Sequence, residues 1–518
     1  MNNTPKTGLR RALVALVALC LIAAACGSDD DSGEASGSAS DSASASASAS
    51  ASASASEPAS ADDGEASEDG AAAGGDINGD GILQVGIMGE CEGPFGGFHE
   101  DVVGGASLAF IELAGASSNS STSALEGFSG ATVAGVEIEL VGIGCGDDTP
   151  DTAIQEIRRL VEQDGSEVIL GPLSGDESIA MANFAKDNPD ITIINGTAGA
   201  QETTLQVQAE NYFRFNGDGA QWNAGIGDIL HNTAGWETAA VIVDDYSFGW
   251  TSAAGFIAEF CAAGGDVVQR VFPPLGTTDY SSFVAQLPDP DEVDGYFWVV
   301  GGTGTQASLE AFVNAKGDLN GAQHAGNLFF NPGLAAALGP GIAGAYVGGF
   351  ASLPGDVTSP AIDAYIAAAD GAWESLPGAL SGNEPAAPSV ALTFGFGYSY
   401  YVAGLALIEA MEANGGDISP AGLQASLAGL TLDAPYGQIT LDENRQAIVD
   451  AAVQQLVLDD NGEVVSRTVA IVPGVDQTFG GVFSPDTPPP SREDPGCVEA
   501  DLPWVGNAIP VVDGVPQG

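Results

Sequence analysis

The chain has 518 residues, with 70 Asp and Glu against 12 Lys and Arg, and its formal net charge is −58 at pH 7. This sign excludes nucleic acid as a partner, because binding to a phosphate backbone needs a basic surface. Most of the acidic residues are expected to form a solvated surface that keeps the protein soluble, rather than an acidic docking surface.

Residues 1–26 have the pattern of an export signal. Two arginines precede an apolar run, Ala12 to Ala25, that is shorter than the span of about 20 residues needed to cross a bilayer. The run ends in small residues followed by Cys26, and this junction resembles a bacterial lipobox. The resemblance implies that Cys26 is lipidated and anchors the mature protein to the outer face of the cell membrane.

Residues 27–76 consist almost entirely of Ser, Ala, Gly, Asp and Glu. A segment of this composition cannot bury an apolar core, so we expect a disordered linker. A coil of this length reaches roughly 35–40 Å, which suits a tether between a membrane anchor and a folded body.

The body, residues 77–518, exceeds what one hydrophobic core usually supports, and strands alternate with helices along it. In its first part, helices separate four expected strands: Leu83–Met88, Val136–Val141, Val168–Leu170 and Ile191–Ile194. Such a series predicts a mostly parallel sheet covered by helices on both faces.

A second series of the same kind follows. Its expected strands are Thr238–Val243, Asp266–Phe272, Gly295–Val300 and Leu328–Phe330. The chain is therefore predicted to be an α/β protein with two doubly wound parallel-sheet lobes and a ligand site between them. The Pro- and Gly-rich tail, residues 481–518, is expected to be irregular.

Two Gly-rich turns follow successive strands of the first series and contain Ser174, Gly196, Thr197 and Ala198. Unpaired backbone N–H groups at a strand-to-helix turn can hold a small anion such as a carboxylate. The Ser174 and Thr197 hydroxyls would add directional hydrogen bonds. The alternative is that these two residues only cap their helices.

Aromatic residues also occur at predicted strand ends, and Phe95, Tyr246 and Phe248 are candidates to contact a ligand. The alternative is that they belong to the core. The only arginine near these turns is Arg214, beside an expected hinge. This argues against phosphate, sulfate or a dicarboxylate, which usually engage a bidentate arginine.

Four cysteines lie in the body: Cys91, Cys145, Cys261 and Cys497. Export permits disulfides, and four cysteines allow three connectivities. Cys91 and Cys145 each follow a predicted strand, so we favour Cys91–Cys145 together with Cys261–Cys497, the latter fixing the tail to a helix. The histidines are scattered and no C-x-x-C pair occurs, so neither a metal nor another cofactor is expected.

Eight segments, taken in order, resemble the type I periplasmic binding proteins, specifically the solute-binding lipoproteins of branched-chain amino-acid ABC transporters (the leucine/isoleucine/valine-binding group). The segments are QVGIMGECEGPFGGF, GASLAFIELAG, EVILGPLSGDES, IINGTAGAQETT, AAVIVDDYSFGWT, PPLGTTDYSSFVAQL, GYSYYVAGLALIEAMEANGG and APYGQITLDENRQAI. Together they extend over most of residues 82–460.

The resemblance implies two lobes that close on a small ligand about a three-crossover hinge, with crossovers near Asn216, Phe350 and Ala447. The first lobe would contain residues 77–215 and 351–446, and the second residues 216–350 and 447–480.

The resemblance also implies roles for individual residues. Ser174, Gly196 and Thr197 would hold a ligand carboxylate, Phe248 with Tyr246 would stack on the ligand, and Thr303 occupies a ligand-facing position. Asp244 or Asp245 could meet an ammonium group, although a helix-capping role is the alternative for both.

The function implied is capture of a small solute, an amino acid or a related carboxylate or amide, by a monomer that delivers it to a membrane ABC permease. An alternative is a sensor that signals to a membrane receptor, since the fold serves both uses. A serine hydrolase is a weaker alternative because Gly171-Pro172-Leu173-Ser174-Gly175 departs from the G-x-S-x-G pattern.

Overall fold

The computed structural model describes residues 77–302, 304–328, 338–350, 359–393, 395–498, 500–512 and 514–517. The predictions for the signal segment, Cys26, the linker and Thr303 therefore lie outside the described residues. Within these ranges no helix is long and apolar enough to span a bilayer.

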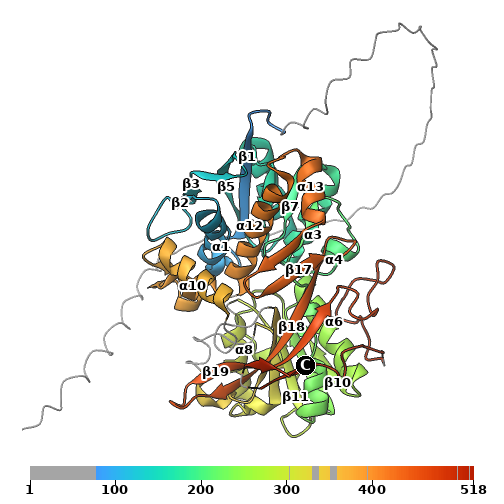
Figure 1. Ribbon diagram of the computed structural model, residues 1–518. Helices are drawn as coiled ribbons and strands as arrows, with labels where there is room; N and C mark the ends of the chain where they lie inside the picture. Colours follow the sequence, from blue (N-terminus) through green and yellow to red (C-terminus); the bar gives the residue numbers. More distant parts are fainter. Residues whose placement is uncertain are drawn as a thin grey trace, which may run out of the picture. The chain divides into compact units, whose positions relative to one another are not determined.

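The first lobe is built on a six-stranded sheet (Figure 1). All neighbouring strands in it run parallel except the first pair, which is antiparallel. The order across the sheet is β4 (Ala131–Val133), β5 (Val136–Gly146), β1 (Ile82–Glu90), β6 (Val168–Leu170), β7 (Thr192–Ile194) and β8 (Tyr212–Phe213). The central strands β6 and β7 are buried throughout, as expected for short apolar strands covered on both faces.

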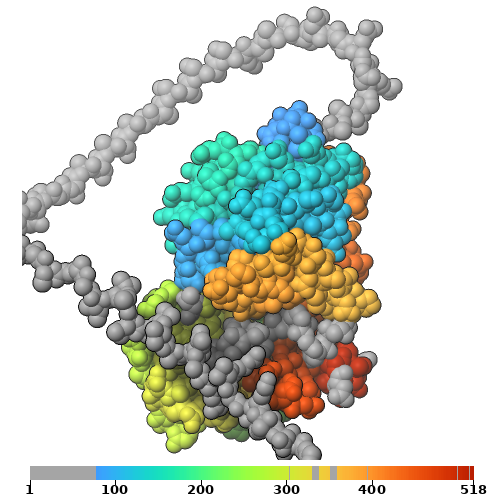
Figure 2. Space-filling model, turned by 90° about the vertical axis from the view of Figure 1, so that its left-hand side faces the viewer, coloured from blue at the N-terminus to red at the C-terminus, as the bar shows by residue number. Residues whose placement is uncertain are grey.

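Helices far apart in the sequence cover this sheet. They are α1 (His99–Leu113), α2 (Pro150–Arg158), α3 (Gly175–Asp187), α4 (Glu202–Leu205), α10 (Pro360–Ala372), α11 (Pro388–Leu392), α12 (Gly395–Asn414) and α13 (Pro420–Ala428). Figure 2 shows residues 360–393 in orange against the blue and cyan of the first lobe, and α10 and α11 both contact α1. Helix α12 packs so closely on α1 that a Cβ at Gly105 would collide with the Gly397 carbonyl.

The second lobe is built on a longer, mixed sheet. Its first five strands run parallel: β10 (Asp266–Val271), β9 (Thr238–Val243), β11 (Gly295–Val299), β12 (His324–Gly326) and β13 (Tyr346–Phe350). Antiparallel strands then continue it: β18 (Ala447–Leu458), β19 (Val464–Val475), β20 (Ile509–Val512) and β21 (Val515–Pro516). The hairpin of β16 (Thr431–Ala434) and β17 (Gly437–Leu441) joins β18. The helices α6 (Ser247–Ala262), α7 (Ser281–Val284) and α8 (Gly304–Lys316) belong to this lobe.

The expected α/β class with two parallel-sheet lobes is confirmed, with two corrections. The structure has a strand at His324–Gly326, the chain has left the extended conformation at Leu328, whose φ is +54°, and residues 329–330 of the predicted strand lie outside the described residues. A Cβ at Gly326 would collide with the Trp298 carbonyl, so β12 passes β11 closely at a glycine. The tail is also not wholly irregular, since β20 and β21 extend the second sheet.

A buried arginine joins the connections between the lobes. The backbone of Arg214, just after β8, forms an isolated parallel bridge with Gln446, just before β18. The Arg214 side chain is fully buried and donates to Thr204 Oγ1 and the Ala200 carbonyl, each at 2.7 Å, and to Gln446 Oε1. The third connection follows β13 and includes residues 351–358, outside the described residues.

Both favoured disulfides are confirmed. Cys91 directly follows β1 and Cys145 is the penultimate residue of β5, with their Cα atoms 5.0 Å apart, and Cys261 of α6 is joined to Cys497 of the tail with a Cα separation of 5.5 Å. The Cys91–Cys145 pair therefore ties two strand ends that lead into the interlobe region. The Cys261–Cys497 pair fixes the tail to the second lobe.

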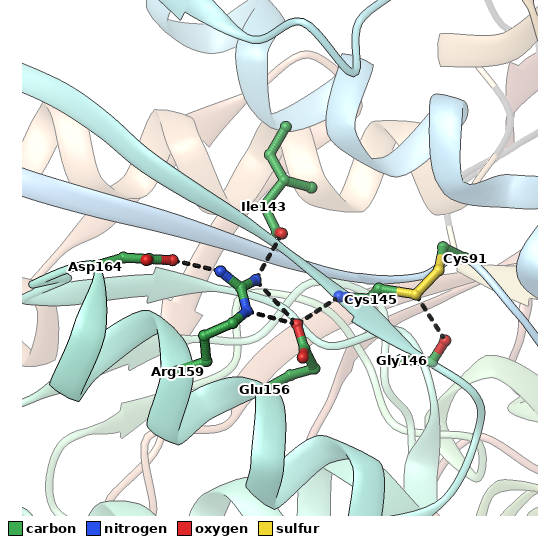
Figure 3. Close-up of polar contacts among 7 residues, drawn as sticks. All are labelled: Cys91, Ile143, Cys145, Gly146, Glu156, Arg159 and Asp164. Atoms are coloured by element: carbon green, nitrogen blue, oxygen red, sulfur yellow. Dashed lines mark hydrogen bonds and ion pairs between the residues drawn. A yellow bond between two sulfur atoms is a disulfide. The ribbon is translucent and has the colours of Figure 1, made fainter.

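A second brace holds the end of β5 (Figure 3). Arg159 donates to the Ile143 carbonyl at 2.8 Å and to Glu156 Oε2 at 2.9 Å, and it also pairs with Asp164. Glu156 in turn accepts the Cys145 N–H at 3.1 Å. The strand end that carries Cys145 is thus held by an ion-pair network as well as by the disulfide.

Candidate functional site

A small cavity lies where the two lobes meet. The first lobe contributes Phe95, Leu173, Thr197 and Phe396, and the second contributes Trp222, Tyr246, Phe248 and Leu328. Five of these eight residues are aromatic, so the walls are mostly rings.

The rings form a continuous contact across the two lobes. The ring centroid of Phe95 lies 6.4 Å from that of Tyr246 and 6.1 Å from that of Phe396. Phe248 lies 5.9 Å from Tyr246 and 5.2 Å from Trp222. Tilted and edge-on contacts at these separations are favourable for aromatic pairs, so the rings stabilise each other as well as the closed arrangement.

Two hydrogen bonds donated by backbone N–H groups join the lobes beside the cavity. The Ser247 N–H at the start of α6 donates to Asp176 Oδ1 of α3 at 3.1 Å, and the Gly219 N–H donates to the Gly199 carbonyl at 2.8 Å. A Cβ at Gly199 would lie 2.8 Å from the Phe248 ring. The glycine is therefore required by the close approach of this aromatic residue.

Four of the predicted ligand residues line the cavity: Phe95, Thr197, Tyr246 and Phe248. Ser174 lies beside Leu173 but is not itself part of the wall, and neither are Gly196 and Ala198. A Cβ at Gly196 would collide with the Tyr400 ring, so this glycine is explained by packing against α12. The cavity residues that sequence reasoning missed are Leu173, Trp222, Leu328 and Phe396.

The backbone donors expected to hold a ligand carboxylate are engaged within the protein. Glu90 Oε1 accepts the N–H groups of Leu173 and Ser174 at 3.1 and 2.7 Å. The Pro172 carbonyl accepts those of Thr197 and Ala198 at 3.1 and 3.3 Å. Both turns therefore form as predicted, but the chain itself supplies their acceptors.

The two hydroxyls do not cap helices. Ser174 stands at the N-cap of α3, yet its side chain makes no capping hydrogen bond. Its Oγ is buried without a hydrogen-bond partner and faces the Asp148 carboxyl without reaching hydrogen-bond geometry. The Thr197 hydroxyl donates instead to the Phe396 carbonyl at 3.2 Å. The capping alternative is wrong for both residues.

A group of buried acids surrounds the cavity, and sequence reasoning missed most of it. Glu90 is the last residue of β1, Asp148 lies in the turn after β5, and Glu177 lies on α3. Glu177 Oε1 accepts the Asp147 and Asp148 N–H groups at 3.1 and 3.0 Å, and Asp148 Oδ2 accepts the Phe95 N–H at 3.2 Å. The available sequence signal was position, since each acid stands at a strand end or a helix start on the ligand side.

The second lobe adds Asp244, at the end of β9. Its Oδ2 accepts the Gly301 N–H at 2.9 Å, while its Oδ1 is buried without a partner. The neighbouring Asp245 instead pairs with Arg492 of the tail and accepts from Trp250 Nε1 at 3.0 Å. Neither carboxyl caps α6, whose N-cap is Tyr246 without a side-chain cap, so the capping alternative is wrong here too.

Burial raises the pKa values of these acids. Burial, and then repulsion from Glu177, raises the pKa of Asp148 to about 7. Burial is also the main reason that the pKa of Asp244 is raised to about 8, with Asp148 adding to it across the lobes. The pKa of Glu90 is raised well above its usual range by burial and by repulsion from Glu177 and Asp148. Without a cation, such carboxyls favour the protonated form near neutral pH.

Comparison with known proteins identifies the family. A family model described as periplasmic binding protein matches residues 83–463. The chain belongs to the periplasmic binding protein family. Its fold is that of the type I members, so the resemblance seen in the sequence is confirmed. No curated protein sequence matches it.

Several solved structures are similar to this periplasmic binding protein. A solute-binding protein of an ABC transporter from R. palustris, in complex with benzoate, is 21% identical over 76% of this chain and 98% of its own, with a TM-score of 0.61. An ABC transporter substrate-binding protein from Sphaerobacter thermophilus is 20% identical over 76% and 99%, with a TM-score of 0.61. A leucine-binding protein from Thermotoga maritima is 19% identical over 76% and 99%, with a TM-score of 0.57. At these identities the similarity establishes the fold.

The raised pKa values predict that thermal stability falls as pH rises. The pKa values of Asp148 and Asp244 in the folded protein lie above their ordinary value of 3.8, so the folded state binds more protons than the unfolded state. The resulting stability is fully present below pH about 4 and is lost as pH rises through about 7 to 8. Melting temperatures measured between about pH 5 and pH 9 at constant ionic strength should decline.

Asp244→Asn should flatten that decline, because an amide does not titrate in this range. Asp245→Asn is the matched control and should leave the profile unchanged, since Asp245 is paired with Arg492. A melting temperature that rises over this interval would contradict the assignment.

Proposed function

We propose that the protein is an extracytoplasmic lipoprotein that captures a small solute in the interlobe cavity and, acting as a monomer, delivers it to an ABC permease. The observation that carries this proposal is the aromatic cavity formed by strand ends of both lobes. Each lobe supplies half of the cavity wall, so a bound solute would stabilise the arrangement in which the lobes are closed. A permease could then distinguish the closed, loaded protein from the open, empty one.

The solute proposed is an amino acid or a related amide or carboxylate with an apolar body. The mostly aromatic lining supports an aromatic or aliphatic body, since burial of such a group between rings is favourable. The structural relatives agree with this size class, because one was crystallised with benzoate and another is a leucine-binding protein.

A thermal-shift panel tests the function. The purified full-length chain is heated with amino acids, their amides and amines, aromatic carboxylates, and sugars. A ligand at about 100 times its dissociation constant stabilises the folded state by roughly 2.7 kcal/mol, which gives a clear rise in melting temperature. We expect at least one compound with an apolar body to do so. The proposal fails if none of them shifts the transition.

Ser174→Ala should weaken binding of the tightest compound of that panel by about 0.5–1.5 kcal/mol, measured by calorimetry. The melting temperature without ligand should barely change, because the Ser174 hydroxyl has no hydrogen-bond partner. Ser178→Ala is the matched control on the same helix. Its hydroxyl donates to Gly175 at 2.7 Å and contacts Thr203 at 2.7 Å, so stability should fall while affinity is retained. Equal affinity in both variants would remove Ser174 from the site.

The anchor is tested separately, because it rests only on the sequence around Cys26. Cells fed a labelled fatty acid should incorporate the label into the protein, and the protein should sediment with membranes. Cys26→Ser should abolish both and release the protein into the soluble fraction. Label that persists in this variant would place the lipid elsewhere.

A further inference from the structure

The surroundings of the cavity are acidic, and in the described part of the chain no Lys or Arg lines it. The pKa of Tyr246, one of the wall residues, is raised by burial and then by the charges of Asp244, Asp148, Asp176 and Glu90. The nearest arginines are committed elsewhere, Arg214 to its buried hinge partners and Arg492 to Asp245. A solute in this cavity therefore meets carboxyls that favour the neutral form near pH 7 in its absence and that a bound cation would ionise.

The positions that could receive an anion are filled by the chain. The Glu90 carboxyl accepts both N–H groups of the turn after β6, and the Pro172 carbonyl accepts those of the turn after β7. A ligand carboxylate would have to displace a fully buried side chain from Ser174. The unpaired donors that remain include Trp222 Nε1 of the wall and the Ser174 hydroxyl, so a carboxylate in this cavity would replace only part of its lost hydration.

Two buried carboxyl oxygens near the cavity lack hydrogen-bond partners, and they come from different lobes. Asp148 Oδ1 and Asp244 Oδ1 are buried without partners, while the second oxygen of each is fixed by a backbone N–H. The N–H that fixes Asp148 belongs to Phe95, a wall residue. The one that fixes Asp244 belongs to Gly301, where a Cβ would lie 2.8 Å from the Phe95 ring. Both carboxyls thus stand directly behind the same aromatic wall.

We propose that the solute is a cation, namely an amine or an amino-acid amide with an aromatic or aliphatic body and without a free carboxylate. This inference rests on the proposed function and narrows its solute class. The rings would contact the ammonium group and its apolar body, since cations bind the faces of aromatic rings. Asp148 and Asp244 would supply the opposite charge from the two sides of the cleft, so that the cation also draws the lobes together.

Two matched sets of compounds test the charge class by calorimetry with the full-length chain. One set is phenylalaninamide, phenethylamine, phenylalanine and 3-phenylpropionate, and the other has the corresponding forms with a leucine side chain. We expect the amine or the amide of at least one set to bind about tenfold or more tightly than the free amino acid, and the carboxylate without an amine to bind least.

Each outcome separates this inference from the proposed function. If a free amino acid or a carboxylate such as benzoate binds as tightly as the amines, the cation inference is wrong and the solute-binding function stands. If no amine or amide binds, the inference is also wrong. If nothing in the broader thermal-shift panel binds either, the proposed function fails with it.

Asp244→Asn should weaken binding of phenethylamine or its leucine analogue by about tenfold or more, because it removes one opposite charge and keeps the shape. Asp245→Asn is the matched control, adjacent in sequence but paired with the tail, and should keep the affinity. Asp148→Asn tests the first lobe in the same way and replaces Asp244→Asn if that variant does not fold. Undiminished amine affinity in folded Asp148→Asn and Asp244→Asn would overturn the proposal.

Discussion

The ligand side of the first lobe depends on the hydrogen bonds that the Glu90 carboxyl accepts. It ends β1 and accepts the N–H groups of Leu173 and Ser174 in the turn after β6. Since these N–H groups are buried, leaving them unpaired would cost about 1–3 kcal/mol each. The carboxyl therefore fixes the turn that begins α3, and with it the wall residue Leu173. Glu177 and Asp148 extend the same network to the end of β5.

This internal acceptor changes what the cavity can recognise. A Gly-rich turn with free N–H groups is suited to an anion, whereas in this turn the Glu90 carboxyl already accepts those N–H groups. The fold of the family is thus retained while the donors expected for a carboxylate pocket are engaged within the protein. Aromatic walls tolerate this change, because ring faces interact well with both apolar groups and cations.

The lobes are coupled through a second buried polar network at the hinge. Gln477, in a stretch that carried no recognisable motif, donates to Asp442 at 2.7 Å and accepts from Thr204 at 3.1 Å. Thr204 also accepts from Arg214, whose other N–H groups reach the turn after β7. The hinge and one wall of the cavity therefore share a continuous set of hydrogen bonds, so that bending at the hinge and the position of that turn are linked.

The sequence by itself determined the alternation of strands and helices and the two-lobe α/β class, and it favoured the two disulfide pairs and four aromatic or polar residues of the cavity wall. The fold class follows from local patterns, namely short apolar strands with Gly-rich turns after them, and the Cys91–Cys145 pair follows from cysteines near neighbouring strand ends. It also predicted the turns that could bind an anion. It missed the antiparallel strands β18 and β19 that enlarge the second sheet, misplaced β12, and did not predict the paired end of the tail.

The tertiary structure decided which groups meet. Glu90 and Ser174 are 84 residues apart, and Phe396 reaches Thr197 across 199 residues, so no local pattern joins them. Asp244 and Asp245 are adjacent and chemically identical, yet of the two only Asp245 forms an ion pair, because the tail places Arg492 beside it. Local sequence sets which residues end each strand. Packing between distant strands decides whether the polar groups of those residues form hydrogen bonds within the protein or remain available to a solute.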